Sequence, residues 1–126
     1  MDRSQIESWA NAYIEVQSAP PHEKEGHSSY WAIDKFMLVL DESASPEDCF
    51  AAILAILDKE PPDEVLGVLA AGPLEDLLNY HGTDYVDKIE MEARKNPEFK
   101  DLLGGVWYTK DDELQKRLNT LIGERW

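Results

Sequence analysis

Short apolar stripes at helical spacing, interrupted by Pro and Gly, restrict this sequence to a helical fold. Along residues 4–18 the apolar side chains recur every three or four positions, which is typical of an amphipathic helix. The Pro20-Pro21 pair ends that segment, because proline disfavours helical backbone at the residue before it. Residues 106–108 alone are typical of a strand, and three residues are too few to indicate a sheet. We therefore expect an all-α fold.

The same pattern of apolar stripes interrupted by Pro and Gly predicts seven further helices. One of them has a clear start, because Ser45 is a good N-cap and Pro46 suits the first helical position. The Gly72-Pro73 step fits the end of one helix and the start of the next, which Gly82 then ends before Thr83 caps another. The eight helices are expected over residues 4–18, from 28 or 29 to about 40, 45–60, 63–71, 73–80, 83–95, 97–103, and from 111 or 112 onwards.

The length of 126 residues is that of one domain, and such a chain can bury a core without disulfide bonds. We expect a single compact all-helical domain over residues 1–126. It divides into an N-terminal helical pair (1–45), a central part (46–107) and a C-terminal helix (108–126). An irregular helical bundle and an α-solenoid-like stack of helical hairpins both fit the short joints, and no strict repeat decides between them.

Charge excludes two classes of partner. The chain carries 12 basic and 26 acidic residues, a net charge of −14. A nucleic-acid backbone or an anionic membrane surface would be repelled, so we expect neither as a partner. The single cysteine, Cys49, allows no intrachain disulfide and lies in an apolar stretch, where we expect it to be buried. No secretory leader or membrane-spanning segment is visible, which favours a cytoplasmic protein.

No catalytic motif is present. The sequence has no nucleophile elbow, phosphate-binding glycine loop or metal-ligand spacing, and His22 and His27 fall in an expected loop. We therefore expect no cofactor and no metal, and a protein that is not an enzyme. One enzymatic alternative stays open: a small hydrolase that uses Glu75, Asp76 and His81, although helix-terminus roles account for all three.

The central part resembles a known family. The segments LAAGPLEDLL (69–78), His81-Gly82 and LLGGVW (102–107), with Pro97 and Phe99 between them, are similar to a family of small bacterial proteins described as a domain of unknown function. The resemblance covers residues 46–107 and implies a helical bacterial protein. It implies no activity and no functional residue.

The distribution of acidic residues gives the leading hypothesis. Between Asp41 and Asp76 ten acids face one base, Lys59. If the helix joints that carry them gather on one side, they form a negative surface that attracts a basic partner. We therefore expect a non-enzymatic protein-binding module, most specifically an immunity-type inhibitor of a basic bacterial toxin such as a nuclease. The candidate partner-binding residues are Asp41, Glu42, Glu47, Asp48, Asp58, Glu60, Asp63 and Glu64.

The alternative is a structural, adaptor or self-associating domain whose charge serves solubility alone. Its partner would be neutral or a second copy of the chain. The sequence does not choose between a monomer and a homodimer.

Overall fold

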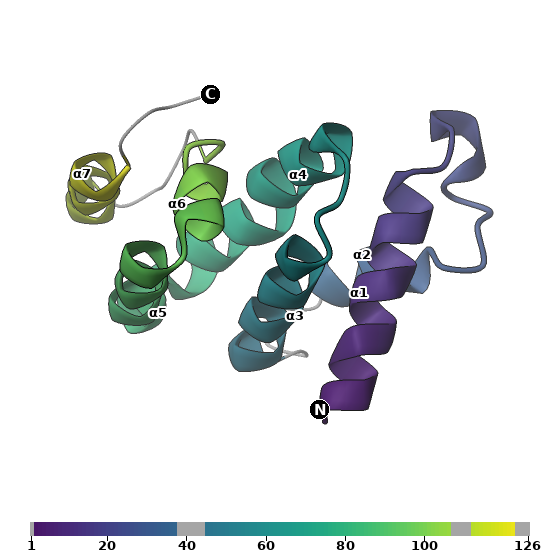
Figure 1. Cartoon of the computed structure of the whole chain (residues 1–126), viewed down its shortest axis with the longest axis horizontal. Coiled ribbons are helices and arrows are strands. Elements are labelled where there is room, and N and C mark those ends of the chain that lie inside the picture. The colour runs from purple at the N-terminus through teal and green to yellow at the C-terminus, as the bar shows by residue number, and fades with distance from the viewer. Residues whose placement is uncertain (1, 38–44, 107–111, 123–126) are drawn as a thin grey trace.

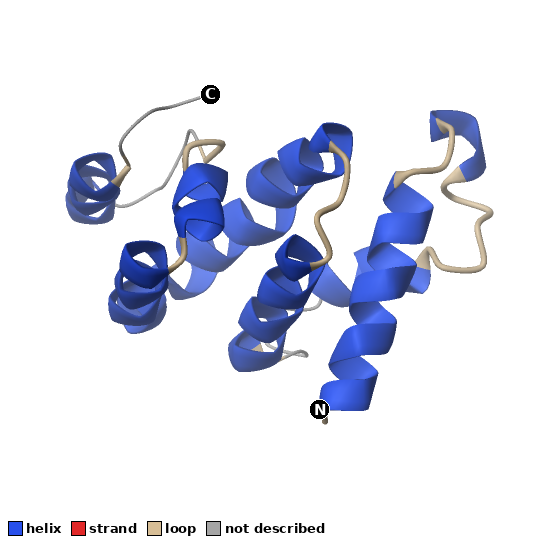
Figure 2. Ribbon diagram, viewed as in Figure 1, coloured by secondary structure: helices blue, strands red, loops and turns tan. Residues whose placement is uncertain are grey.

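The computed structural model describes residues 2–37, 45–106 and 112–122, apart from the side chain of Thr83. Helices make up 81% of these residues, which contain no strand, and the all-α prediction is confirmed (Figure 2). The seven α-helices are α1 (Arg3–Gln17), α2 (Trp31–Met37), α3 (Pro46–Asp58), α4 (Asp63–Leu69), α5 (Glu75–Lys95), α6 (Pro97–Leu103) and α7 (Asp112–Leu121), with a 3-10 turn, η1 (Pro21–Glu23), and a π-helical turn, η3 (Ala70–Leu74).

Side-chain caps fix where several helices begin. The hydroxyl of Ser45 accepts from the backbone N–H of Asp48 at 3.4 Å, so the predicted start of α3 is confirmed. The side chain of Asn96 accepts from the N–H of Phe99 at 3.2 Å and starts α6 in the same way. A capping box at Asp2 starts α1.

The predicted corner at Gly72-Pro73 is wrong. The chain stays helical through this step, because α4 passes into the π-helical turn η3 and then directly into α5. The wider turn accommodates Pro73, which has no N–H to give to an α-helical ladder and whose ring crowds the preceding turn. No described glycine has a positive φ, so Gly72 does not adopt the left-handed backbone expected of a helix end.

The predicted break at Gly82 is also wrong, as is the cap at Thr83. Both residues lie inside α5, a single helix of 21 residues, and His81 beside them does not sit at a helix end. Gly82 is buried, and a Cβ atom placed on it would lie 2.6 Å from Cδ2 of Leu114 in α7. This glycine therefore permits the close approach of α7, a non-local reason that the local sequence does not reveal.

The helices follow one another across the molecule almost in chain order, from α1 and α2 at one side to α7 at the other (Figure 1). Helix α1 packs on α2 and α3, α3 packs on η3, α5 and α6, and α5 packs on α6 and α7. Packing between near neighbours along the chain is typical of stacked helical hairpins. The helices form a single all-α domain.

One apolar core runs through all seven α-helices. At the N-terminal side Trp9 is fully buried, and its Nε1 donates to the carbonyl of Ala32 at 3.0 Å. The ring of Phe36 packs against Trp9 and against Tyr13. In the described part of the chain, no helix is both long enough and apolar enough to cross a membrane. The largest fully buried side chains are Trp9, Tyr13, Phe99, Ile53, Ile56, Leu69, Leu74, Leu77, Leu78, Ile89, Leu102 and Leu103.

Candidate functional site

The first group of predicted partner-binding acids lies at the N-terminal end of α3. Glu47 and Asp48 occupy its first turn, where negative charge favours the helix dipole. Glu47 also lies 3.7 Å from the ammonium of Lys88 on α5, which neutralises part of this group. Asp41 and Glu42, predicted to belong to the same surface, lie outside the described residues.

The second group lies at the other end of α3 and in the turn to α4. Asp58 ends α3, Glu60 lies in the turn, and Asp63 and Glu64 form the first turn of α4; all four are exposed. Ten residues of helix separate Asp58 from Asp48, about 15 Å along the axis. The six described acids therefore divide into two groups at opposite ends of one helix.

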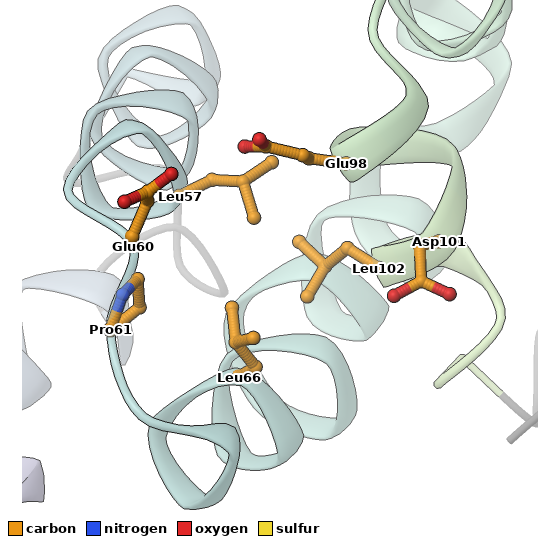
Figure 3. Close-up of a pocket in the computed structure, with 7 residues that line it drawn as sticks. All are labelled: Leu57, Glu60, Pro61, Leu66, Glu98, Asp101 and Leu102. Carbon is orange, nitrogen blue, oxygen red and sulfur yellow. The ribbon is translucent and has the colours of Figure 1, made fainter.

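Glu60 of the second group lines a pocket of about 230 Å³ with an apolar floor, whereas Asp63 and Glu64 do not line it. Leu57 of α3, Leu66 of α4 and Leu102 of α6 point towards a common space, which Pro61 closes from the α3–α4 turn (Figure 3). Leu57 and Leu102 are buried and Leu66 is half-buried. Three helices from different parts of the sequence thus build one apolar depression.

Carboxylates surround this depression. Glu60 and Glu98 stand on opposite sides of the opening, and Asp101 follows Glu98 by one turn of α6 (Figure 3). A second pocket adjoins the first, because Leu57 and Glu98 line both. We call the two pockets together the acidic groove. The lining of the second pocket consists of Leu54, Ala55, Leu57, Asp58, Asn96 and Glu98.

The base nearest in sequence does not neutralise the groove. Lys59 points to α1, where its ammonium lies 2.6 Å from the carboxylate of Glu7. This hydrogen bond and the lysine charge hold the pKa of Glu7 below its ordinary value. Among the residues that the structure describes, those that line the two pockets include no Lys or Arg. The four rim carboxylates, Asp58, Glu60, Glu98 and Asp101, therefore present uncompensated negative charge around an apolar floor.

Glu60 has an unusual backbone for its residue type. Its φ is +52°, the one positive φ among the described residues that are not glycine. This residue follows the helix end, where its N–H donates to the carbonyl of Leu57 at 3.1 Å and where glycine is the common choice. A glutamate in left-handed backbone costs about 1–2 kcal/mol, and such strain often accompanies function.

Two rim residues, Glu98 and Asp101, were not predicted from the sequence. Both are on α6, more than 20 positions after Asp76, the last acidic residue of the segment between Asp41 and Asp76. A signal was present, since Glu98, Asp101 and Leu102 are spaced three and four residues apart and so share one helix face.

The residues of the hydrolase alternative do not converge. Glu75, Asp76 and His81 all lie on α5, and none lines the acidic groove. His81 follows the two carboxylates by five and six residues. On a helix this places it about 140° and 240° around the axis from them and at least 7 Å along it. A shared catalytic centre needs groups within hydrogen-bond reach of one reacting atom, which this arrangement does not provide.

The histidine loop and the cysteine have structural roles. The ring Nδ1 of His27 accepts from the N–H of Ser29 at 3.0 Å, which fixes the turn before α2. Burial, with a smaller contribution from Asp48, raises the pKa of the Cys49 thiol to about 11, so the thiol is protonated and unreactive at neutral pH. In the described ranges, no three His, Cys, Asp or Glu side chains are grouped as metal ligands.

One comparison with known proteins gives a match. The model of a family described as a family of unknown function (DUF6869) matches residues 19–125. This confirms the resemblance to a domain of unknown function and extends it beyond residues 46–107 on both sides. No curated protein and no solved structure matches the chain.

Proposed function

The chain belongs to the DUF6869 family, whose function is unknown, and we propose that it is a non-enzymatic protein-binding module that holds a basic protein partner on its acidic groove. The observation that carries the proposal is the combination of an apolar floor with four rim carboxylates, with no Lys or Arg among the described lining residues. The floor supplies buried area, and the carboxylates select for positive charge.

The two parts of the groove have different kinetic effects. Negative charge around the opening, within a molecule of net charge −14, accelerates the approach of a cationic protein and makes that acceleration depend on salt. The apolar contacts form after the encounter and slow dissociation. An inhibitor that must capture a harmful protein quickly and hold it needs both properties.

The most specific form of the proposal is an immunity-type inhibitor of a basic bacterial toxin that acts in the cytoplasm. A toxin that cleaves nucleic acid carries a basic surface, and the rim carboxylates would occupy that surface as phosphates do. We accordingly expect an adjacent reading frame that encodes a protein with a basic toxin-like domain.

The test measures binding of that adjacent gene product by surface plasmon resonance over a range of salt concentrations. A rim variant changes Asp58 and Asp101 to Asn and Glu60 and Glu98 to Gln. We expect it to associate about tenfold more slowly at low salt, with a weaker salt dependence than the native chain.

A matched control removes the same number of charges away from the groove. It changes Glu23, Glu25, Asp34 and Asp112, which are exposed and line neither pocket, to their amides. The proposal requires this control to associate nearly as fast as the native chain. If both variants associated equally slowly, net charge alone would explain the slower association. If the protein encoded by the adjacent gene did not bind, the toxin-inhibitor form of the proposal would be overturned.

A further inference from the structure

We infer that the segment held in the acidic groove is amphipathic and basic, with an apolar side chain in the pocket above Leu57, Leu66 and Leu102 and a Lys or Arg in the adjoining pocket. The inference rests on the proposed function and adds the chemistry of the partner's contact segment. It follows from a difference between the two pockets, which share one wall but offer different surroundings.

The first pocket suits an aliphatic side chain. Three leucines and Pro61 form its floor, and its volume is about 230 Å³. One or two side chains of a partner fill such a space. A Leu or Met buried there is stabilised because its apolar area is removed from water, while a charged group on the leucine floor would lose hydration.

The adjoining pocket suits a cation. Asp58 and Glu98 supply carboxylate oxygens to this pocket. The Asn96 side chain also lines it and is held in place, because its Nδ2 donates to Glu92 and its Oδ1 accepts from the N–H of Phe99. Leu54 and Ala55 give this pocket an apolar side, against which the methylene stem of a Lys or Arg can lie. A guanidinium can also bond one carboxylate with two parallel N–H groups.

The shared wall allows one partner segment to supply both the apolar side chain of the first pocket and the cation of the adjoining pocket. Leu57 and Glu98 line both pockets, so side chains from neighbouring positions of one partner segment reach both. Residues three or four apart on a helix share one face, so one partner helix can present a side chain to each pocket, as in other helix-in-groove complexes.

Fluorescence anisotropy with labelled peptides tests the inference. The first probe is a peptide of Leu-Arg-Ala-Arg repeats, which places leucine on one face of a helix with arginine beside it. A second probe of Ala-Arg-Ala-Arg repeats keeps the charge, and a third of Leu-Gln-Ala-Gln repeats keeps the leucines. We expect the first probe to bind about tenfold more tightly than either of the others.

Variants locate the binding. Leu66→Gln places an amide on the floor of the first pocket, and Val68→Gln is its matched control, because Val68 is 41% exposed on the same helix and lines neither pocket. We expect about tenfold weaker binding of the first probe to Leu66→Gln and unchanged binding to Val68→Gln. Ala55→Arg, at a half-buried position, places a competing cation in the second pocket and should weaken binding even if Leu66→Gln proves unstable in a thermal melt.

The outcomes separate this inference from the proposed function. Equal affinity for the Leu-Arg and Ala-Arg probes would overturn the inference and leave a purely electrostatic module in place. Binding of the Leu-Arg probe that is insensitive to both Leu66→Gln and Ala55→Arg would place the interaction elsewhere and also overturn it. Failure of every probe, together with failure of the adjacent gene product to bind, would remove the proposed function itself.

Discussion

At the scale of single residues, Glu60 combines strain with a place on the groove. Its left-handed backbone costs about 1–2 kcal/mol, and glycine would remove this cost but add flexibility to the unfolded chain that opposes folding by about 0.5–1 kcal/mol. We expect Glu60→Gly to raise the free energy of unfolding by about 0.5–1 kcal/mol while weakening binding of a cationic probe. Chemical denaturation and fluorescence anisotropy measure the two effects.

The substitution Glu60→Gln separates charge from backbone. It removes the carboxylate but keeps a residue for which left-handed backbone is costly, so we expect weaker binding without the gain in stability. If Glu60→Gln stabilised the chain as much as Glu60→Gly, repulsion between rim carboxylates, and not backbone strain, would explain the result.

Glu7 and Lys59 make a pH-dependent connection between α1 and the end of α3. The folded chain holds the pKa of Glu7 below its ordinary value of 4.5, so this carboxylate adds stability above that pH, and the contribution is lost as the pH falls through the folded pKa. We expect a double-mutant cycle of Glu7→Gln and Lys59→Met to give a favourable coupling energy at neutral pH that vanishes in acid. Urea unfolding at several pH values measures it; a coupling energy that persists at low pH would contradict the assignment.

At the scale of elements, two helical glycines are expected to respond differently to alanine. Beyond its own stretch of helix, Gly67 in α4 has no described heavy atom within 4 Å of an added Cβ, whereas Gly82 in α5 has Leu114 of α7 at 2.6 Å. Gly67→Ala should stabilise the chain by about 0.5–1 kcal/mol through helix propensity. At Gly82 the same gain is offset because the Leu114 side chain must move, and Gly82→Leu should displace α7.

Thermal melts and hydrogen exchange of the α7 amides test this pair. Exchange in α7 should rise in Gly82→Leu and stay unchanged in Gly67→Ala. Equal protection of α7 in both variants would mean that Gly82 does not control how closely α7 approaches α5.

The limits of several helices were predictable because the determining groups are local. Ser45 and Asn96 cap the residues that follow them, and Pro46 and Pro97 each take the first position of a helix. The errors arose where a distant contact or an unusual turn decides the outcome. The sequence around Gly82 predicts a helix end, but the glycine is there because Leu114 packs against it. The sequence around Pro73 predicts a helix start, but a π-helical turn accommodates the proline inside a continuous helical segment.

At the scale of the whole molecule, two of the four rim carboxylates could be predicted from the sequence. The count of acidic residues along the sequence identified Asp58 and Glu60 because both lie in the segment between Asp41 and Asp76. It could not select Glu98 and Asp101, since only the packing of α6 beside the α3–α4 turn brings them to the same groove. The count also grouped Glu47 and Asp48 with the others, although the length of α3 separates them. Net charge is read from composition, but its arrangement depends on tertiary structure.

Net charge also bears on whether the chain associates with itself, the alternative that would make its acidity a matter of solubility. Two copies of charge −14 repel one another, and this repulsion is screened beyond about 10 Å at 0.1 M salt. On α5 the exposed Tyr80 and Met91 lie three turns apart on one face, but Asp84 and Asp87 lie between them, so they make no continuous apolar patch there. We therefore expect multi-angle light scattering to give the monomer mass of 14.4 kDa at low and at high salt. A dimer that persists in high salt would instead favour the self-associating alternative, because apolar contacts between copies survive screening while electrostatic docking of a basic partner does not.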